Sequence, residues 1–301
     1  MSYIQSALIK LRGRAALVGK WQTAVVVVFF SGIGSILAGL VQGNALSSID
    51  LYVLLQAVMR GGTEAYDMLE AAVSPHLAWI LASQLLNLLI TPSLTLGSIS
   101  YFLKIQRGGN PPFSEIFSQF RRFFRNLLLY LLIGIKVLLW SLLFSIPATL
   151  LMLFTPVAFL GQLVIWCGIV ATVIATLRYM QASYFFVDAP DAGVRHAVRE
   201  SKIIMRGRIG QGFFLGLSFI GWELLCNLPT SLISNYAAGY IVSMFAAQFL
   251  SAYRGSSFAA YYMTLRGDAI VRQRSPREAV YDSFAESSDD ESGDDDEKPF
   301  L

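Results

Sequence analysis

The feature that most constrains this chain is a series of six long apolar stretches. A helix needs about 20 apolar residues to cross the roughly 30 Å hydrocarbon core of a bilayer. Six stretches meet this need, at residues 21–41, 77–103, 126–154, 157–186, 209–228 and 238–263. Only 14% of the residues are charged, against about a quarter in soluble domains. The sequence therefore predicts an all-α polytopic membrane protein with six transmembrane helices.

The first stretch has two interpretations, because four basic residues precede it and a signal peptide has the same order. A signal core usually runs about 7–15 residues, whereas residues 21–41 are apolar almost throughout. We therefore expect an uncleaved membrane anchor.

The charges of the connections between the stretches predict their orientation. The segments 1–20, 104–125, 187–208 and 266–281 carry net charges of +4, +4, +2 and +2. The connections between them carry −3 at residues 42–76 and no charge at 155–156 and 229–237. Basic connections stay in the cytoplasm. The alternation therefore predicts that both termini are cytoplasmic.

Three basic amphipathic segments each precede a pair of apolar stretches. They read "LIKLRGRAALVGKW", "EIFSQFRRFFRN" and "AVRESKIIMRGRIG". This favours a membrane domain over residues 1–265 built from three units of a surface helix and a two-span hairpin, at 1–103, 104–187 and 188–265. The alternative is that any cytoplasmic segment before a span attracts cations. We keep both.

The third of these segments is the most regular. Its cations recur at steps of four, three and four residues, while mostly apolar residues occupy the opposite side of a helix. Such a helix is expected to lie in the headgroup plane, with its cations toward anionic lipid. The cations are Arg195, Arg199, Lys202 and Arg206. Alternatively, these charges serve only to hold the connection inside the cell.

Four ionisable residues fall within the apolar stretches: Lys136, Arg178, Glu223 and Arg254. Each costs about 2.5–3.5 kcal/mol at the bilayer centre on insertion scales. One hypothesis is a polar cavity open to the cytoplasm that holds an anionic headgroup or small anion, with Glu223 as a counter-charge. The alternative is structural: the long cationic side chains reach the interface, although this does not account for Glu223.

The chain ends in an acidic segment. Residues 282–301 contain nine acidic residues and one lysine, together with Ser and Gly. Such a composition predicts a disordered tail over residues 266–301. In the cytoplasm it would bind a basic protein partner, fold back on the protein's own cationic face, or only solvate the chain.

Two segments resemble a known family. The run "RYMQASYFFVDAPDAGVRHAVRESKIIMRGRIGQGFFLGLSFIGW" and the N-terminal "RGRAALVGKW" are similar to a bacterial integral-membrane family catalogued as domain of unknown function 975. The resemblance covers the chain to about Leu265. Where that family has Pro-Gly in the fourth span, this chain has "CGIVATVIA". The resemblance implies a membrane location and supplies no reaction.

Several chemistries have no support in the sequence. It contains no GxxxxGK[ST], HExxH or GxSxG motif, and its two cysteines, Cys167 and Cys226, lie in apolar runs. We therefore predict no catalytic residue, metal, cofactor or nucleic acid, and membrane lipids as partners. The favoured function is a non-enzymatic module of the bacterial cytoplasmic membrane that assists envelope homeostasis or a partner complex. The alternative is a small transporter or a lipid- or anion-handling protein that uses an intramembrane charged cavity.

Overall fold

The computed structural model describes residues 2–38, 53, 56, 64–154, 158–233 and 236–273. Every regular element within these ranges is a helix, as the sequence predicts. The α-helices are α1 Ser2–Ala16, α2 Trp21–Ser31, α5 Glu64–Val73, α6 Leu77–Gln106, α7 Phe123–Phe154, α8 Ala158–Tyr179, α9 Ala182–Asp188, α10 Val194–Ile204, α11 Ile209–Leu232 and α12 Tyr236–Gln273. Short 3₁₀ helices are η1 Ser74–His76, η2 Phe113–Arg122 and η3 Pro190–Ala192.

Four helical runs are long and apolar enough to cross a membrane. They are Asp67–Gln106, Phe113–Leu151, Leu160–Asp188 and Ile209–Thr230, and they correspond to four of the six predicted spans. A polypeptide with four such runs is compatible with a multi-pass membrane protein.

The two remaining predicted spans are not confirmed in the described residues. The stretch 21–41 begins with α2, an apolar helix of 11 residues, and its last three residues lie outside the described ranges. The stretch 238–263 lies within the single long helix α12, but Ser, Tyr, Gln and Gly lower its hydropathy. Ser256, Ala259 and Tyr262 in this helix are fully buried against other helices, so this part of α12 needs fewer apolar residues than a helix surrounded by lipid.

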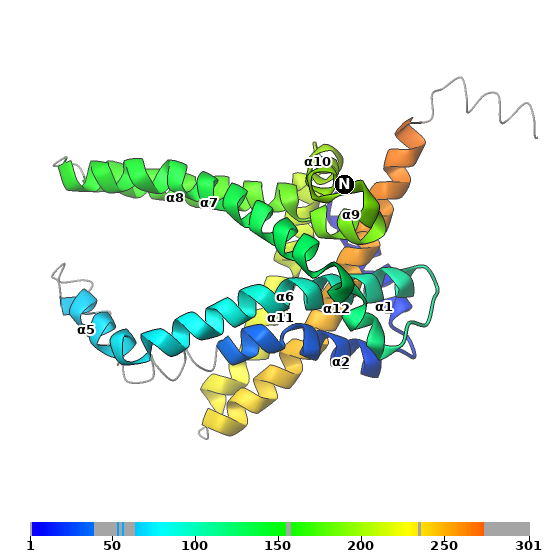
Figure 1. Ribbon diagram of the computed structural model, residues 1–301, viewed down its shortest axis with the longest axis horizontal. Helices are drawn as coiled ribbons and strands as arrows, with labels where there is room; N and C mark the ends of the chain where they lie inside the picture. The colour runs from blue at the N-terminus through cyan, green and yellow to red at the C-terminus, as the bar shows by residue number, and fades with distance from the viewer. Residues whose placement is uncertain are drawn as a thin grey trace, which may run out of the picture.

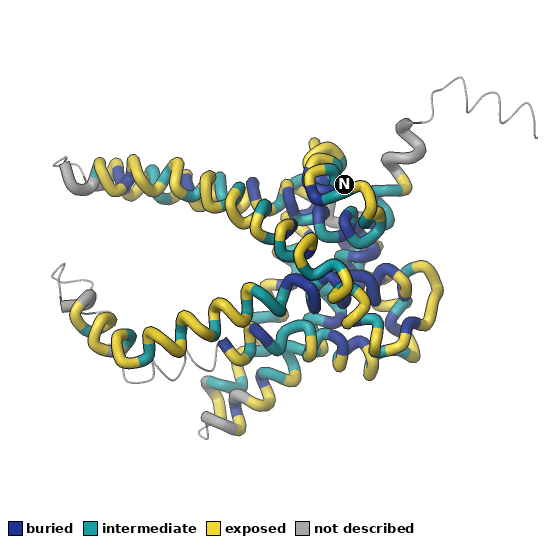
Figure 2. The backbone as a smooth tube through the Cα atoms, viewed as in Figure 1, coloured by how far each residue is buried: buried dark blue, intermediate teal, exposed yellow. Residues whose placement is uncertain are grey.

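The buried residues gather at one end of the molecule, which we call the hub. The hub consists of α1, η2, α9, α10, residues 92–105 of α6 and residues 252–265 of α12. Figure 1 shows the paired helices α7 and α8, and the run from α5 into α6, extending away from it, and Figure 2 shows that burial is concentrated in the hub. On the extended helices α7 and α8, large side chains such as Leu138, Leu143 and Trp166 are exposed. This distribution is what hydrocarbon rather than water would tolerate.

Small residues allow the hub helices to approach closely. A Cβ added to Gly13 of α1 would lie 2.8 Å from Cα of Ser257 on α12, and one added to Gly255 would lie 2.6 Å from the Phe102 ring of α6. The backbones of α1 and α12 therefore meet almost directly at Gly13, and Gly255 makes room on α12 for the Phe102 ring of α6. This close contact centres the hub on α12.

Polar contacts join the basic connections to one another in the hub. Lys20 donates to the backbone oxygen of Gly109, and Arg122 forms an ion pair with Asp191 at 3.3 Å. The connections predicted to share the cytoplasmic side therefore meet at one end of the molecule. Residues 266–273 of the predicted tail are the end of α12, and residues 274–301 lie outside the described ranges.

Candidate functional site

The candidate site is built around the turn between α10 and α11. Helix α10 ends at Ile204, and Gly207 then adopts a positive φ of 77°. Glycine reaches this backbone conformation without strain because it has no Cβ. Tyr261 of α12 donates a hydrogen bond to the backbone oxygen of Arg208 at 3.2 Å, and Met205 is fully buried. The turn is therefore fixed to the hub on one side and open on the other.

A pocket of about 410 Å³ lies on the open side of this turn. We call it the cationic pocket. Four of the residues that line it are cations from α8, α10 and the turn, and the others are apolar or glycine. No acid is among the described residues that line it. The lining consists of Arg178, Arg199, Lys202, Ile203, Met205, Arg206, Gly207 and Ile209.

Helices α8 and α10 are joined where they form the wall of the pocket. The Ser201 hydroxyl of α10 donates to the backbone oxygen of Arg178 at 2.8 Å, and Ser201 itself is fully buried. Arg178 lies in the last turn of α8, where a cation interacts favourably with the helix dipole. One of the four cations has a nearby acid, because Arg199 Nε lies 3.7 Å from the carboxylate of Glu200. The pocket therefore keeps a clear positive excess.

This arrangement suits anion binding and does not suit metal binding. Arginine guanidinium groups present paired N–H donors that match carboxylate and phosphate oxygens. In the part of the chain that the structure describes, no group of three or more His, Cys, Asp or Glu side chains could hold a metal ion.

The cationic pocket combines residues that the sequence assigned to two different sites. Arg178 was expected inside the membrane, whereas Arg199, Lys202 and Arg206 were expected on a surface helix. Arg195, the fourth cation of that helix, is exposed and is not among the residues lining the pocket.

Helix α10 forms where the charge spacing predicts it, but protein covers its apolar face. Val194, Ala197, Val198 and Ser201 are buried, and α10 contacts α7, α8, α9 and α12. The expectation that this face dips into lipid is not confirmed, because periodicity identifies an apolar face without identifying what covers it.

The other charges predicted inside the membrane lie apart from the cationic pocket. Glu223 of α11 and Arg254 of α12 form an ion pair, and both side chains are 43% exposed. Lys136 is half-buried on α7, a helix that contributes no lining residue to the pocket. The structure thus brings two of the four predicted residues together and places a third, Arg178, with the surface cations.

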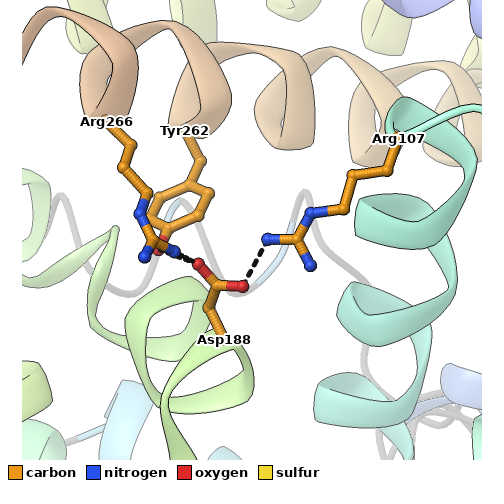
Figure 3. Close-up of polar contacts among 4 residues, drawn as sticks. All are labelled: Arg107, Asp188, Tyr262 and Arg266. Atoms are coloured by element: carbon orange, nitrogen blue, oxygen red, sulfur yellow. Dashed lines mark hydrogen bonds and ion pairs between the residues drawn. The ribbon is translucent and has the colours of Figure 1, made fainter. Parts of the chain in front are cut away.

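A buried cluster around Asp188 was not predicted from the sequence (Figure 3). The Asp188 side chain is only 6% exposed and forms ion pairs with Arg107, which follows α6, and Arg266 of α12. The Tyr262 hydroxyl donates at 3.0 Å to the same Asp188 oxygen that Arg266 contacts. A buried carboxylate needs such partners, so the cluster fastens α6, α9 and α12 together. In the sequence, Asp188 is the acid at the end of "YFFVD". It entered the prediction of orientation only as part of the net charge of residues 187–208.

The comparisons with known proteins agree with the resemblance drawn from "YFFVD", "IIMRG" and "RGRAALVGKW". Searches of the curated proteins and of the solved structures found no match. The model of one family, described as "Protein of unknown function (DUF975)", matches residues 1–269. The match covers most of the chain, including the hub and the cationic pocket, so this protein belongs to the DUF975 family.

Proposed function

We propose that this protein is a non-enzymatic, multi-pass protein of the bacterial cytoplasmic membrane that holds an anionic lipid headgroup or another anionic ligand in the cationic pocket. Both termini, and with them the hub, face the cytoplasm. The observation that carries the proposal is the convergence of Arg178, Arg199, Lys202 and Arg206 on one pocket with no acid in its described lining.

The position of the pocket supports a ligand at the membrane boundary. Arg178 lies in the last turn of α8, and Ile209 begins α11, and both helices belong to runs that are long and apolar enough to cross a membrane. Each Lys or Arg near an anionic leaflet contributes about 1 kcal/mol of attraction. Ile203, Met205 and Ile209 add apolar surface beside the cations, which suits the carbon atoms next to a headgroup.

The test is the lipid that stays bound to the purified protein. We expect native mass spectrometry in mild detergent to show anionic lipid enriched over zwitterionic lipid on the unaltered protein. The variant Arg199→Gln/Lys202→Gln/Arg206→Gln should lose that enrichment. The matched control is Arg195→Gln, which removes a cation from the same helix outside the pocket and should keep it. Equal enrichment on the triple variant and the unaltered protein would contradict the proposal.

A second candidate function is a membrane module that assists envelope homeostasis or a partner complex. The pairing of Glu223 with Arg254 favours it over a transporter, because each charge already has a partner and Arg178 lies in a different place. If the pair is structural, Glu223→Gln/Arg254→Gln should retain lipid binding and insertion. An acidic tail that binds a basic partner stays a proposal, since residues 274–301 lie outside the described ranges.

A further inference from the structure

We infer that the cationic pocket selects a phosphate group with more than one negative charge, a terminal phosphomonoester or a diphosphate, over a phosphodiester. The inference rests on the proposed function and names the chemical class of its ligand. It follows from the number of charges in the pocket, the geometry of their donors and the apolar part of the lining.

The number of charges is the first argument. The pocket has four cations, and Glu200 lies close enough to offset part of the charge of Arg199. A phosphodiester carries one negative charge and would leave most of this excess uncompensated. A phosphomonoester carries about −1.5 to −2 near pH 7, and a diphosphate carries more. Met205 and Ile209 make part of the lining apolar, so an uncompensated charge is less well screened here and costs more free energy than on an open surface.

The donor geometry is the second argument. Three of the four cations are arginines, on α8, on α10 and in the Gly207 turn. Each guanidinium can offer two parallel N–H groups to two oxygens of one phosphate. A terminal phosphate has three free oxygens and a phosphodiester has two, so the terminal group can accept bonds from more of these donors at once.

The volume and the apolar lining fit both a lipid headgroup and a small phosphate compound. A hollow of about 410 Å³ lies within the usual range of ligand pockets, about 300–1,000 Å³. Ile203 on the rim is 59% exposed and would lie beside the hydrocarbon of a lipid. The terminal phosphate is the chemistry that the two sources share.

The experiment compares two lipids on the full-length protein in detergent micelles. Short-chain phosphatidic acid has a terminal phosphomonoester, and short-chain phosphatidylglycerol has a phosphodiester. We expect calorimetric titration to show phosphatidic acid bound about tenfold more tightly, a difference of about 1.4 kcal/mol. The preference should fall below about twofold in Arg199→Gln/Arg206→Gln, since each Arg adds about 1 kcal/mol. Arg195→Gln should keep the preference, and variants are compared only where their thermal unfolding midpoints match the unaltered protein.

A competition arm identifies the source of the phosphate. Displacement of phosphatidic acid by inorganic pyrophosphate would show that the phosphate group alone is sufficient for binding. A preference for phosphatidic acid without such displacement would show that the lipid chain is required. Either result supports the inference.

The outcomes also separate the inference from the proposed function. Equal affinity for the two lipids, lost in Arg199→Gln/Arg206→Gln, would overturn the inference and leave the proposed function standing. No binding of either lipid, and none of inorganic pyrophosphate in a direct titration, would overturn both. A preference that survives in Arg199→Gln/Arg206→Gln would place the selective site elsewhere and overturn the inference.

Discussion

The turns before α2 and before α11 have nearly the same backbone. Gly19 and Gly207 have φ values of 76° and 77°, and the next residues, Lys20 and Arg208, have φ/ψ of −124°/9° and −121°/6°. The residues two positions before each glycine, Leu17 and Met205, are both fully buried. The first and third of the proposed units therefore begin an apolar helix in the same way.

The two turns differ in the exposed side chains one position and eight positions before the glycine, which we call the rim residues. Arg199 and Arg206, which line the cationic pocket, correspond to Leu11 and Val18 in the first unit, which are 61% and 71% exposed. The comparison teaches that the glycine turn is a structural device, while the choice of rim residues decides whether it presents a charged or an apolar surface.

The middle unit shares the packing of the other two but not their turn. Residues three and six positions after the start of the helix are Ala24 and Val27 in α2, and Asn126 and Leu129 in α7, and all four are fully buried. However, the 3₁₀ helix η2 leads directly into α7, without a glycine of positive φ. These parallels favour a genuine threefold repeat, which stays a hypothesis.

The largest expected effect comes from exchanging a residue between the first and third units. Gly13 corresponds to Ser201, and a Cβ at Gly13 would lie 2.8 Å from the backbone of Ser257. Gly13→Ser should lower the free energy of unfolding by about 3 kcal/mol, because overpacking forces the two backbones apart. Chemical denaturation in detergent micelles measures this.

A control for that exchange is Gly210→Ser on α11, where a Cβ would have no neighbour within 4 Å. We expect a change within about 0.5 kcal/mol there. If both variants lost the same stability, the close approach of α1 and α12 would be wrong.

The next effect exchanges the two rims. Arg199→Leu/Arg206→Val gives the third unit the side chains of the first and removes two of the four cations of the pocket. Binding of anionic lipid should weaken by roughly 30-fold, from about 1 kcal/mol for each cation. Calorimetric titration would detect this, with Arg195→Leu as the control that binds normally. Undiminished binding would mean that the charged rim is not what distinguishes the two turns.

The sequence was sufficient for features that depend on composition and local spacing. Apolar length predicted α6, α7 and α11, and the cation spacing predicted α10. It was not sufficient for contacts between distant segments. Asp188 meets Arg107 and Arg266 only because three helices converge, and neither spacing nor charge counting brings together residues that are 81 and 78 positions apart.

The break of the fourth predicted span illustrates the same limit. Residues 157–186 read as one apolar stretch, but α8 ends at Tyr179 and α9 starts at Ala182. The break brings Arg178 to the end of a helix beside α10, where Ser201 bonds its backbone. Hydropathy does not register such a break, so the sequence did not predict that Arg178 lines the pocket together with the cations of α10.

A smaller effect is expected at the glycines themselves. Gly207→Ala and Gly19→Ala should each lower the free energy of unfolding by about 1.5 kcal/mol, because a residue with a Cβ is strained at positive φ. Nothing lies within 4 Å of a Cβ at either position, so the loss would come from the backbone alone. Equal losses in thermal or chemical unfolding would confirm that the two turns are equivalent. A loss at one glycine only would contradict it.

The smallest effect tests how the pocket is held in shape. Ser201→Ala removes the hydroxyl that donates to the Arg178 backbone and should lower the free energy of unfolding by about 1 kcal/mol. The control is Ser218→Ala. The Ser218 hydroxyl donates to the backbone oxygen of Leu215 in its own helix, so its loss should change stability by less than about 0.5 kcal/mol. Because Ser201 joins α8 to α10, its loss should also weaken binding of anionic lipid, whereas Ser218→Ala should not. If Ser201→Ala lost stability but bound lipid normally, the hydrogen bond would serve the fold alone, and the cations would reach the ligand without the aid of the α8–α10 contact.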